Sequence, residues 1–363
     1  MLFYSILYFI TLAFLTFDFV KISLGVKKLL LTFIMFIFTI VVGISNDMGG
    51  DMPQYRILFE EAPYLDDFQF GSYYKESGYI FLNSFFKTFF DSFNAMLFFI
   101  TAVNFYLLYK VIVYKDFQKY MFFSFYIYIT GYMFAGMFGL LRQHIIMSIF
   151  LFALLMLIKN KKFNYYLAVV FAMLFHRISA IYLIFTYFFK RNFSVTNYNV
   201  IFIIAFTLGV SGLLFIVLIN TFGFFSIPEI QSALLKVKTY YISQLNKSVI
   251  NFAFFEKALL FGMVVFYFKK LVELNPINYI LINIFFINVF IYMLLIQDLG
   301  LAGRISKVFK IVEILLIPQL FLIAVKKNIK NGLFLFFVIL GFAHYYKELF
   351  RNLEYFVPYS TIF

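Results

Sequence analysis

The feature that most constrains this chain is a succession of apolar runs, each long enough to cross a lipid bilayer. About 20 apolar residues span the hydrocarbon core as a helix. An open strand would leave unpaired backbone groups in lipid, so every span is expected to be helical. The sequence therefore predicts an all-α, polytopic bundle. The apolar runs lie near residues 2–20, 29–45, 93–113, 120–138, 141–158, 200–220, 252–268, 276–296, 305–325 and 332–345.

Composition excludes a soluble multi-domain protein. The 363 residues are 64% hydrophobic and 13% charged, against about 45–50% and about 25% in soluble domains. The first run lacks a basic leader and a small-residue cleavage site, so we expect it to be retained as a span. The chain has no cysteine, which excludes disulfides and thiolate metal sites. Its three histidines are scattered, so no metal or other cofactor is expected.

The net charge of +13 has a topological explanation. Lys and Arg cluster in short links between apolar runs, as the positive-inside rule expects, and we expect no nucleic-acid partner. The link 46–92 is rich in Asp and Glu and is predicted to be external. Its later part, 79–90, is apolar and is expected to lie on the membrane as an amphipathic segment. The basic links predicted to be cytoplasmic contain Lys21, Lys27, Lys28, Lys110, Lys115, Lys119, Lys159, Lys161, Lys162, Lys326, Lys327 and Lys330.

The run 163–189 is basic at both ends, so a single helix would place one basic end outside. We predict a helical hairpin that turns near His176 and Arg177, with arms shorter than a full crossing. The chain 1–363 is then one transmembrane domain with about 11–12 helices and external termini. The link 221–251 becomes a second external loop. It contains Lys236, Lys238 and Lys247, which indicates either a long loop that escapes the charge rule or a basic surface for an anionic ligand.

Ionisable side chains within a membrane are costly and indicate candidate functional residues. On this topology Arg142, His176, Arg177, Arg304 and Asp298 lie at or just below the external face. Lys307 and Lys310 follow Arg304 at i+3 steps on one helix stripe, and Glu313 could pair with Lys310. Each one alone can be explained as a snorkelling or packing residue. Their convergence on one side favours a binding site, because topology usually keeps Arg inside.

Several guanidinium groups at external depth are suited to phosphate oxygens. The lipid-embedded phosphate found at that depth is a diphospho-polyprenol carrier. An imidazole beside Arg could act as general base. Asp47, Asp51 and Glu76 could supply carboxylates for sugar hydroxyls or for proton abstraction.

Five short motifs, in this order, resemble the EpsG-like polymerases, which are Wzy-type membrane proteins that extend bacterial surface polysaccharides. They are Asp51 with Tyr55, Glu76 with Gly78 and Tyr79, Arg142 with Gln143, Phe175–His176 with Ser179 and Ala180, and Arg304 with Pro318. The likeness covers most of the chain. One departure is that Arg177 and Ile178 separate His176 from Ser179, where the family more often has one apolar residue.

The resemblance implies a polymerase in the bacterial cytoplasmic membrane that joins undecaprenyl-diphosphate-linked oligosaccharides into O-antigen, capsule or exopolysaccharide. Arg142, Arg177 and Arg304 would stabilise the leaving diphosphate, and His176, Asp51 or Glu76 would deprotonate the acceptor. Lys307, Tyr55 and Gln143 would complete the diphosphate and sugar site. A chain-length regulator and a flippase are the protein partners implied.

Three rival functions remain open. A flippase for the same lipid-linked sugars would be expected to show repeat-related halves, and no repeat is visible. A lipid-sugar-dependent glycosyltransferase or ligase would have an acidic first loop, which Asp47 and Asp51 keep open. A membrane acyltransferase would place its histidine near the cytoplasmic half.

Overall fold

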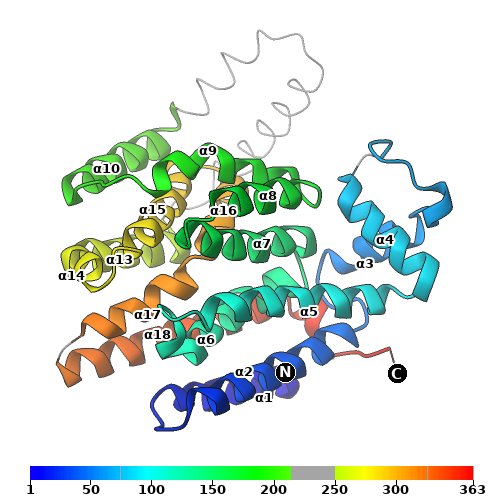
Figure 1. Ribbon diagram of the computed structural model, residues 1–363, viewed down its shortest axis with the longest axis horizontal. Coiled ribbons are helices and arrows are strands. Elements are labelled where there is room, and N and C mark those ends of the chain that lie inside the picture. The colour runs from blue at the N-terminus through cyan, green and yellow to red at the C-terminus, as the bar shows by residue number, and fades with distance from the viewer. Residues whose placement is uncertain (74, 214–249, 325, 363) are drawn as a thin grey trace. The chain divides into compact units, whose positions relative to one another are not determined.

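The computed structural model describes residues 1–362 apart from 74, 214–249 and 325 (Figure 1). The described chain is helical throughout, and its only β pairing is an isolated antiparallel bridge between Ser45 and Thr361. The predicted all-α fold is therefore confirmed. Most of the predicted loop 221–251 lies outside the described residues.

Contacts divide the chain into two units, 1–185 with 314–363, and 186–313. The single domain expected from sequence stays a prediction. The helices of the first unit are α1 (Leu2–Leu15), α2 (Leu24–Gly43), α3 (Met52–Glu60), α4 (Ser77–Phe90), α5 (Phe93–Ile112), α6 (Met121–Tyr132), α7 (Leu141–Ile158), α8 (Lys162–Met173), α18 (Lys327–Arg351) and α19 (Leu353–Phe356). The second unit has α10 (Val195–Ser211), α13 (Phe252–Phe266), α14 (Phe268–Leu274), α15 (Asn278–Leu294) and α16 (Leu299–Lys310). Helices α9 (Ala180–Phe189) and α17 (Glu313–Ile323) cross the division.

Among the described residues, four helices are long and apolar enough to cross a membrane, namely α2, α5, α7 and α18. Shorter apolar helices include α10, α15 and α17. The chain is therefore an integral membrane protein. The predicted span 141–158 coincides with α7, whereas α18 extends beyond the predicted 332–345 at both ends.

The predicted span 305–325 is divided between α16 and α17. Helix α16 begins before the apolar run because the Asp298 carboxylate caps it, accepting the Leu301 N–H at 2.9 Å. It buries Ala302, Val308 and Phe309 on one side and carries the basic stripe on the other. An amphipathic helix of this kind is not a continuation of the apolar α17.

The chain between 163 and 189 reverses direction, as the hairpin prediction required. Helix α8 ends at Met173, and a short 3₁₀ turn, Arg177–Ser179, leads into α9. The Tyr165 hydroxyl donates to the Tyr182 carbonyl at 3.1 Å. In a continuous helix these residues would be about 25 Å apart along the axis. The turn lies where it was predicted, at His176 and Arg177.

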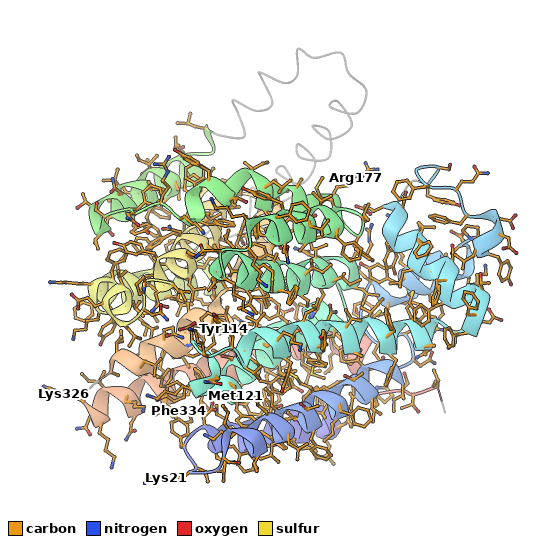
Figure 2. The ribbon with its side chains drawn as sticks, in the orientation of Figure 1. Lys21, Tyr114, Met121, Arg177, Lys326 and Phe334 are labelled. Atoms are coloured by element: carbon orange, nitrogen blue, oxygen red, sulfur yellow. The ribbon has the colours of Figure 1, made fainter. Side chains whose placement is uncertain are left out.

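The basic links of the first unit share one end of its helices. The Lys330 ammonium lies 5.3 Å from the Tyr120 ring centroid, the Phe19 ring packs on Tyr120, and the Lys159 ammonium lies 4.8 Å from the Tyr114 ring centroid. Figure 2 shows Lys21, Tyr114 and Lys326 toward that end and Arg177 at the other. The charge pattern predicted this arrangement.

The other end of the first unit gathers both chain termini and the start of the link 46–92. The Phe3 and Tyr359 rings stack with centroids 4.0 Å apart. The Asn46 N–H donates to the Ser360 carbonyl at 3.1 Å. The link is largely helical, because α3 and α4 lie within it. Helix α4 buries Tyr79 and Phe86 and exposes Phe81 and Phe89.

Candidate functional site

Glu76 is the centre of a charged cluster at the start of α4. One carboxylate oxygen, Oε2, accepts a hydrogen bond from Arg142 Nη1. The other, Oε1, accepts the Arg177 backbone N–H at 3.1 Å and lies 3.7 Å from His176 Nδ1. The side chains of Glu76, Arg142 and His176 are 10%, 16% and 30% exposed. The cluster is thus half-enclosed and open to one side.

Local structure explains why these groups meet. Arg142 is the second residue of α7, where a positive charge is unfavourable against the helix dipole, and a nearby carboxylate offsets that cost. His176 and Arg177 lie in the turn between α8 and α9. The Gly78 N–H donates to the Leu174 carbonyl at 2.9 Å, which holds the first turn of α4 against the hairpin. A Cβ at position 78 would lie 2.6 Å from Leu174 Cβ, so this close approach requires glycine.

Two tyrosines cover the Arg142 side of the cluster. The Arg142 guanidinium carbon lies 5.8 Å from the Tyr79 ring centroid, within cation–π range. The Tyr55 and Tyr79 rings pack edge to face with centroids 5.9 Å apart. Both tyrosines are buried. They therefore restrict the orientations open to the guanidinium.

The electrostatics of the cluster favour an ionised Glu76. Burial raises the pKa of this carboxyl, but the Arg177 N–H, its own backbone amide, and the charges of Arg142 and His176 together lower the pKa below its ordinary 4.5. Burial raises the pKa of Tyr55, and Arg142 opposes that shift. A carboxylate with a lowered pKa and both oxygens engaged is a weak general base.

The structure brings together five of the residues that the sequence singled out, namely Glu76, Arg142, His176, Arg177 and Tyr55. Asp51 lies exposed at the N-terminus of α3, one turn before Tyr55. Gln143 follows Arg142 but is buried, with 5% of its surface exposed.

Arg304 and Lys307 belong to the second unit, on the basic stripe of α16. Arg304 is exposed and Lys307 is half-buried. Their participation in the Glu76 cluster stays a prediction. Ser179 is buried, and its hydroxyl donates to the His176 carbonyl at 2.9 Å, a contact that stabilises the turn.

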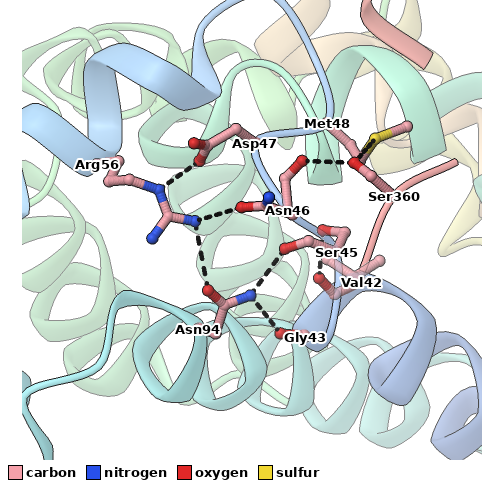
Figure 3. A network of polar contacts seen from close by, with 9 residues as sticks. All are labelled: Val42, Gly43, Ser45, Asn46, Asp47, Met48, Arg56, Asn94 and Ser360. Atoms are coloured by element: carbon pink, nitrogen blue, oxygen red, sulfur yellow. Dashed lines mark hydrogen bonds and ion pairs between the residues drawn. The ribbon is translucent and has the colours of Figure 1, made fainter. Parts of the chain in front are cut away.

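A polar network beside the cluster was not predicted from the sequence (Figure 3). Arg56 Nε donates to the Asp47 carboxylate at 2.6 Å, and Arg56 Nη2 contacts Asn94 Oδ1 at 3.4 Å. Asn94 Nδ2 donates to the carbonyls of Gly43 and Ser45 at 2.9 and 2.7 Å. The network ties α3 to the end of α2 and the start of α5. It therefore holds the start of the link 46–92, and with it the helix that carries Tyr55, against α2 and α5.

A second set of charges lies in the second unit; the sequence indicated Lys310 and Glu313, whereas Glu256 and Lys257 were missed. Lys310 Nζ donates to Glu256 Oε1 at 2.8 Å. Lys257 Nζ donates to Asn288 Oδ1 at 2.6 Å, and Asn288 Nδ2 donates to Glu313 Oε1 at 3.0 Å. Glu256, Lys257 and Glu313 are all buried. The adjacent Glu and Lys within the run 252–268 were the signal that could have indicated this cluster.

Within the described parts of the chain, no group of three His, Asp or Glu side chains is placed to hold a metal ion. The chemistry available at the Glu76 cluster is that of one carboxylate, the Arg142 guanidinium and an imidazole, and the exposed side chain of Arg177 begins beside them. Such a set can bind an anion and move a proton.

The fold and the cluster define a class of protein. It is a polytopic membrane protein that carries arginine, histidine and a carboxylate at the end of its helices opposite the basic links. A model of the EpsG family matches residues 28–361. The chain therefore belongs to the EpsG family, which is associated with exopolysaccharide biosynthesis. Neither the curated proteins nor the solved structures contain a match.

Proposed function

We propose that this protein is a polysaccharide polymerase that joins oligosaccharide units carried on undecaprenyl diphosphate, at the external face of a bacterial cytoplasmic membrane. The observation that carries the proposal is the convergence of Glu76, Arg142, His176 and Arg177 from three separate segments. Membership of the EpsG family supports a role in making surface polysaccharide. The position of the cluster opposite the basic links supports an external site.

The reaction is a group transfer that needs no outside energy source. The hydroxyl at the non-reducing end of a new lipid-linked unit attacks the anomeric carbon of the growing chain. The bond between that carbon and the diphosphate oxygen breaks, and the diphosphate leaves with the bonding electron pair. The hydroxyl proton passes to His176. The developing charge on the diphosphate is stabilised by Arg142 and Arg177.

Glu76 positions the other groups. Its carboxylate holds the Arg142 guanidinium and the Arg177 backbone, and it lies close enough to His176 to stabilise an imidazolium. Because its pKa is lowered, Glu76 is the weaker candidate for proton abstraction. Asp51 is exposed near Tyr55 and is suited to contact sugar hydroxyls. Arg304 and Lys307 are proposed as additional diphosphate ligands.

The proposal is tested in a deletion strain that expresses Arg142→Ala or His176→Ala. We expect both variants to reach the membrane at normal levels and to leave surface lipid capped with a single repeat unit. Arg351→Ala is the matched control, because Arg351 is an exposed arginine in the last turn of α18. Long polymer from both cluster variants would remove the cluster from catalysis. Complete loss of surface sugar in the deletion strain would instead indicate a flippase or an earlier transferase.

Sidedness can be tested directly, because the natural chain has no cysteine. A single cysteine at position 177 should react with a membrane-impermeant thiol reagent added to intact cells. A single cysteine at position 21 should react only after the membrane is opened. Labelling of position 177 exclusively from the cytosolic side would rule out an external reaction.

A further inference from the structure

The segment 355–362 is fastened along the turn that leads into α3, within the first unit. The Gly49 N–H donates to the Tyr355 carbonyl at 3.1 Å. The Ser360 hydroxyl donates to the Asn46 carbonyl at 3.0 Å (Figure 3). The proposed reaction uses no residue of this segment, so its position beside α3 needs a separate explanation.

The backbone of Tyr355 is held in place while much of its ring stays uncovered. Its carbonyl accepts the Gly49 N–H, and the next residue, Phe356, is buried with its ring centroid 4.8 Å from that of Phe134. Tyr355 itself is 46% exposed. A Cβ at Gly50 would lie 3.6 to 4.0 Å from three ring carbons of Tyr355, so the ring lies beside the Gly50 backbone. The rest of the ring is therefore open to a ligand.

Asp51 lies next to this ring, because it follows Gly50 in the chain and consecutive Cα atoms are about 3.8 Å apart. Aspartate at the N-cap of a helix usually accepts a backbone N–H of the first turn. The Asp51 side chain makes no such hydrogen bond to α3. Asp51 is exposed, as is Gln54 three residues later. The Asp51 carboxylate is therefore available to a ligand that also contacts Tyr355.

The turn at Gly49 holds this pair of residues close to the charged cluster. Gly49 has a φ of +110°, in the region that favours glycine, and a Cβ there would collide with the Phe138 carbonyl oxygen. Phe138 lies four residues before Arg142. On the other side, Tyr55 is one helical turn after Asp51, about 5.4 Å along the axis, and is one of the two tyrosines that cover Arg142. The ring and the carboxylate thus lie outside the cluster and next to it.

We propose that Tyr355 and Asp51 form a saccharide subsite, which binds a sugar of the lipid-linked oligosaccharide away from the bond that reacts; the inference rests on the proposed function. The face of an aromatic ring is negatively polarised and attracts the partly positive C–H groups of a sugar ring. A carboxylate accepts hydrogen bonds from sugar hydroxyls. A tyrosine at a membrane interface can instead serve as an anchor among lipid headgroups. Two exposed carboxylates beside the ring, those of Asp51 and Glu354, are unsuited to anionic headgroups and suited to hydroxyls.

The chain has no tryptophan, so Tyr355→Trp introduces a single fluorescent ring at the subsite. The full-length variant, in nanodiscs of phosphatidylethanolamine and phosphatidylglycerol, is titrated with short oligosaccharides made by partial hydrolysis of the surface polysaccharide of the wild-type strain. We expect a saturable change in tryptophan emission. Tyr166→Trp is the matched control, because Tyr166 is 45% exposed on α8, and its emission should not change. No change at position 355, or equal changes at both positions, would overturn the proposal.

Kinetics in proteoliposomes, with lipid-linked units extracted from the deletion strain, separate sugar binding from catalysis. Tyr355→Ala should raise the KM for these units about fivefold and change kcat less than about twofold, whereas Tyr355→Phe keeps the ring and should match the wild type. Asp51→Asn should also raise KM. A lower kcat with unchanged KM would assign Asp51 to proton abstraction and overturn its role in the subsite. Unchanged KM in a well-folded Tyr355→Ala protein would contradict the role of the ring; if that variant does not fold, the fluorescence titration still decides.

The fluorescence titration needs no transfer reaction, so its outcome is separate from the polymer-length test of Arg142→Ala and His176→Ala. A flippase or a ligase for the same sugars would still show the tryptophan response while failing the polymer-length test. A polymerase that binds its sugars elsewhere would pass the polymer-length test and show no response at position 355.

Discussion

Replacing Gly78 by alanine tests the contact that joins α4 to the α8–α9 turn. The added Cβ would lie 2.6 Å from Leu174 Cβ and 2.7 Å from the Leu174 carbonyl oxygen, well inside van der Waals contact. The oxygen is backbone, so it cannot rotate away. The two segments must separate, and Glu76 must move away from His176 and Arg177.

The magnitude follows from three contributions. Overpacking costs about 1–3 kcal/mol. Weakening the Gly78 N–H bond to the Leu174 carbonyl costs about 0.5–1.5 kcal/mol. Replacing a helical glycine by alanine returns about 0.5–1 kcal/mol. The net expectation is a loss of about 0.5–4 kcal/mol in the free energy of unfolding, together with shortened polymer.

The matched control is Gly131→Ala, because Gly131 lies within α6 and an added Cβ there meets nothing within 4 Å. That variant should be neutral or more stable by up to about 1 kcal/mol. Both variants are compared by denaturant titration in mixed detergent micelles and by the length of the polymer in a complemented deletion strain. Equal stability and equal polymer length for the two variants would refute the inference that close packing at Gly78 positions Glu76.

The remaining predictions concern the other polar groups. Lys310→Met removes the ammonium group that pairs with the buried carboxylate of Glu256, which is 4% exposed. Unfolding titrations should then show a loss of about 3 kcal/mol in the free energy of unfolding. The double variant Glu256→Leu with Lys310→Met should recover most of that loss, and an equally unstable double variant would argue against an ion-pair effect. The pKa of Glu76 is lowered in the folded protein, so its contribution to stability is fully present above about pH 4.5 and lost as pH falls through the folded-state pKa. Glu76→Gln should therefore flatten the acid limb of a thermal stability profile, and an unchanged limb would contradict this. Asn94→Ala frees two buried backbone carbonyls and should cost about 2 kcal/mol in the same micelle titration, whereas a loss below 0.5 kcal/mol on that scale would show that water replaces the amide.

The sequence was sufficient for the course of the chain in the first unit because charge determines which links share an end. Basic residues at both ends of the run 163–189 predicted the hairpin, and the hydrogen bond from Tyr165 to Tyr182 confirms it. The same reasoning failed at 305–325, where α16 ends at Lys310 and α17 begins at Glu313. Hydropathy there does not distinguish one long helix from two.

The partners within the candidate site could not be predicted in the same way. Glu76 and Arg142 are 66 residues apart in the sequence, and a charge pattern gives the depth of a residue but not its position around the helical bundle. Their pairing depends on how α4 packs against the hairpin, which the missing side chain of Gly78 permits. Glu256 and Lys257 were missed for a different reason: adjacent opposite charges leave the net charge of the run unchanged, so a pattern based on net charge does not reveal them.

The carboxylate at the centre of the cluster is unexpected in a site proposed for an anionic ligand, because it weakens the attraction for diphosphate. Its presence is explained by the state without substrate. Arg142 is only 16% exposed, and a guanidinium so enclosed needs a counter-charge when no diphosphate is bound. Glu76 supplies that charge, while the exposed Arg177 remains to attract the ligand. The cluster can thus be stable when empty and still bind a diphosphate, because the charge that holds Arg142 in place and the charge that recruits the substrate belong to different residues.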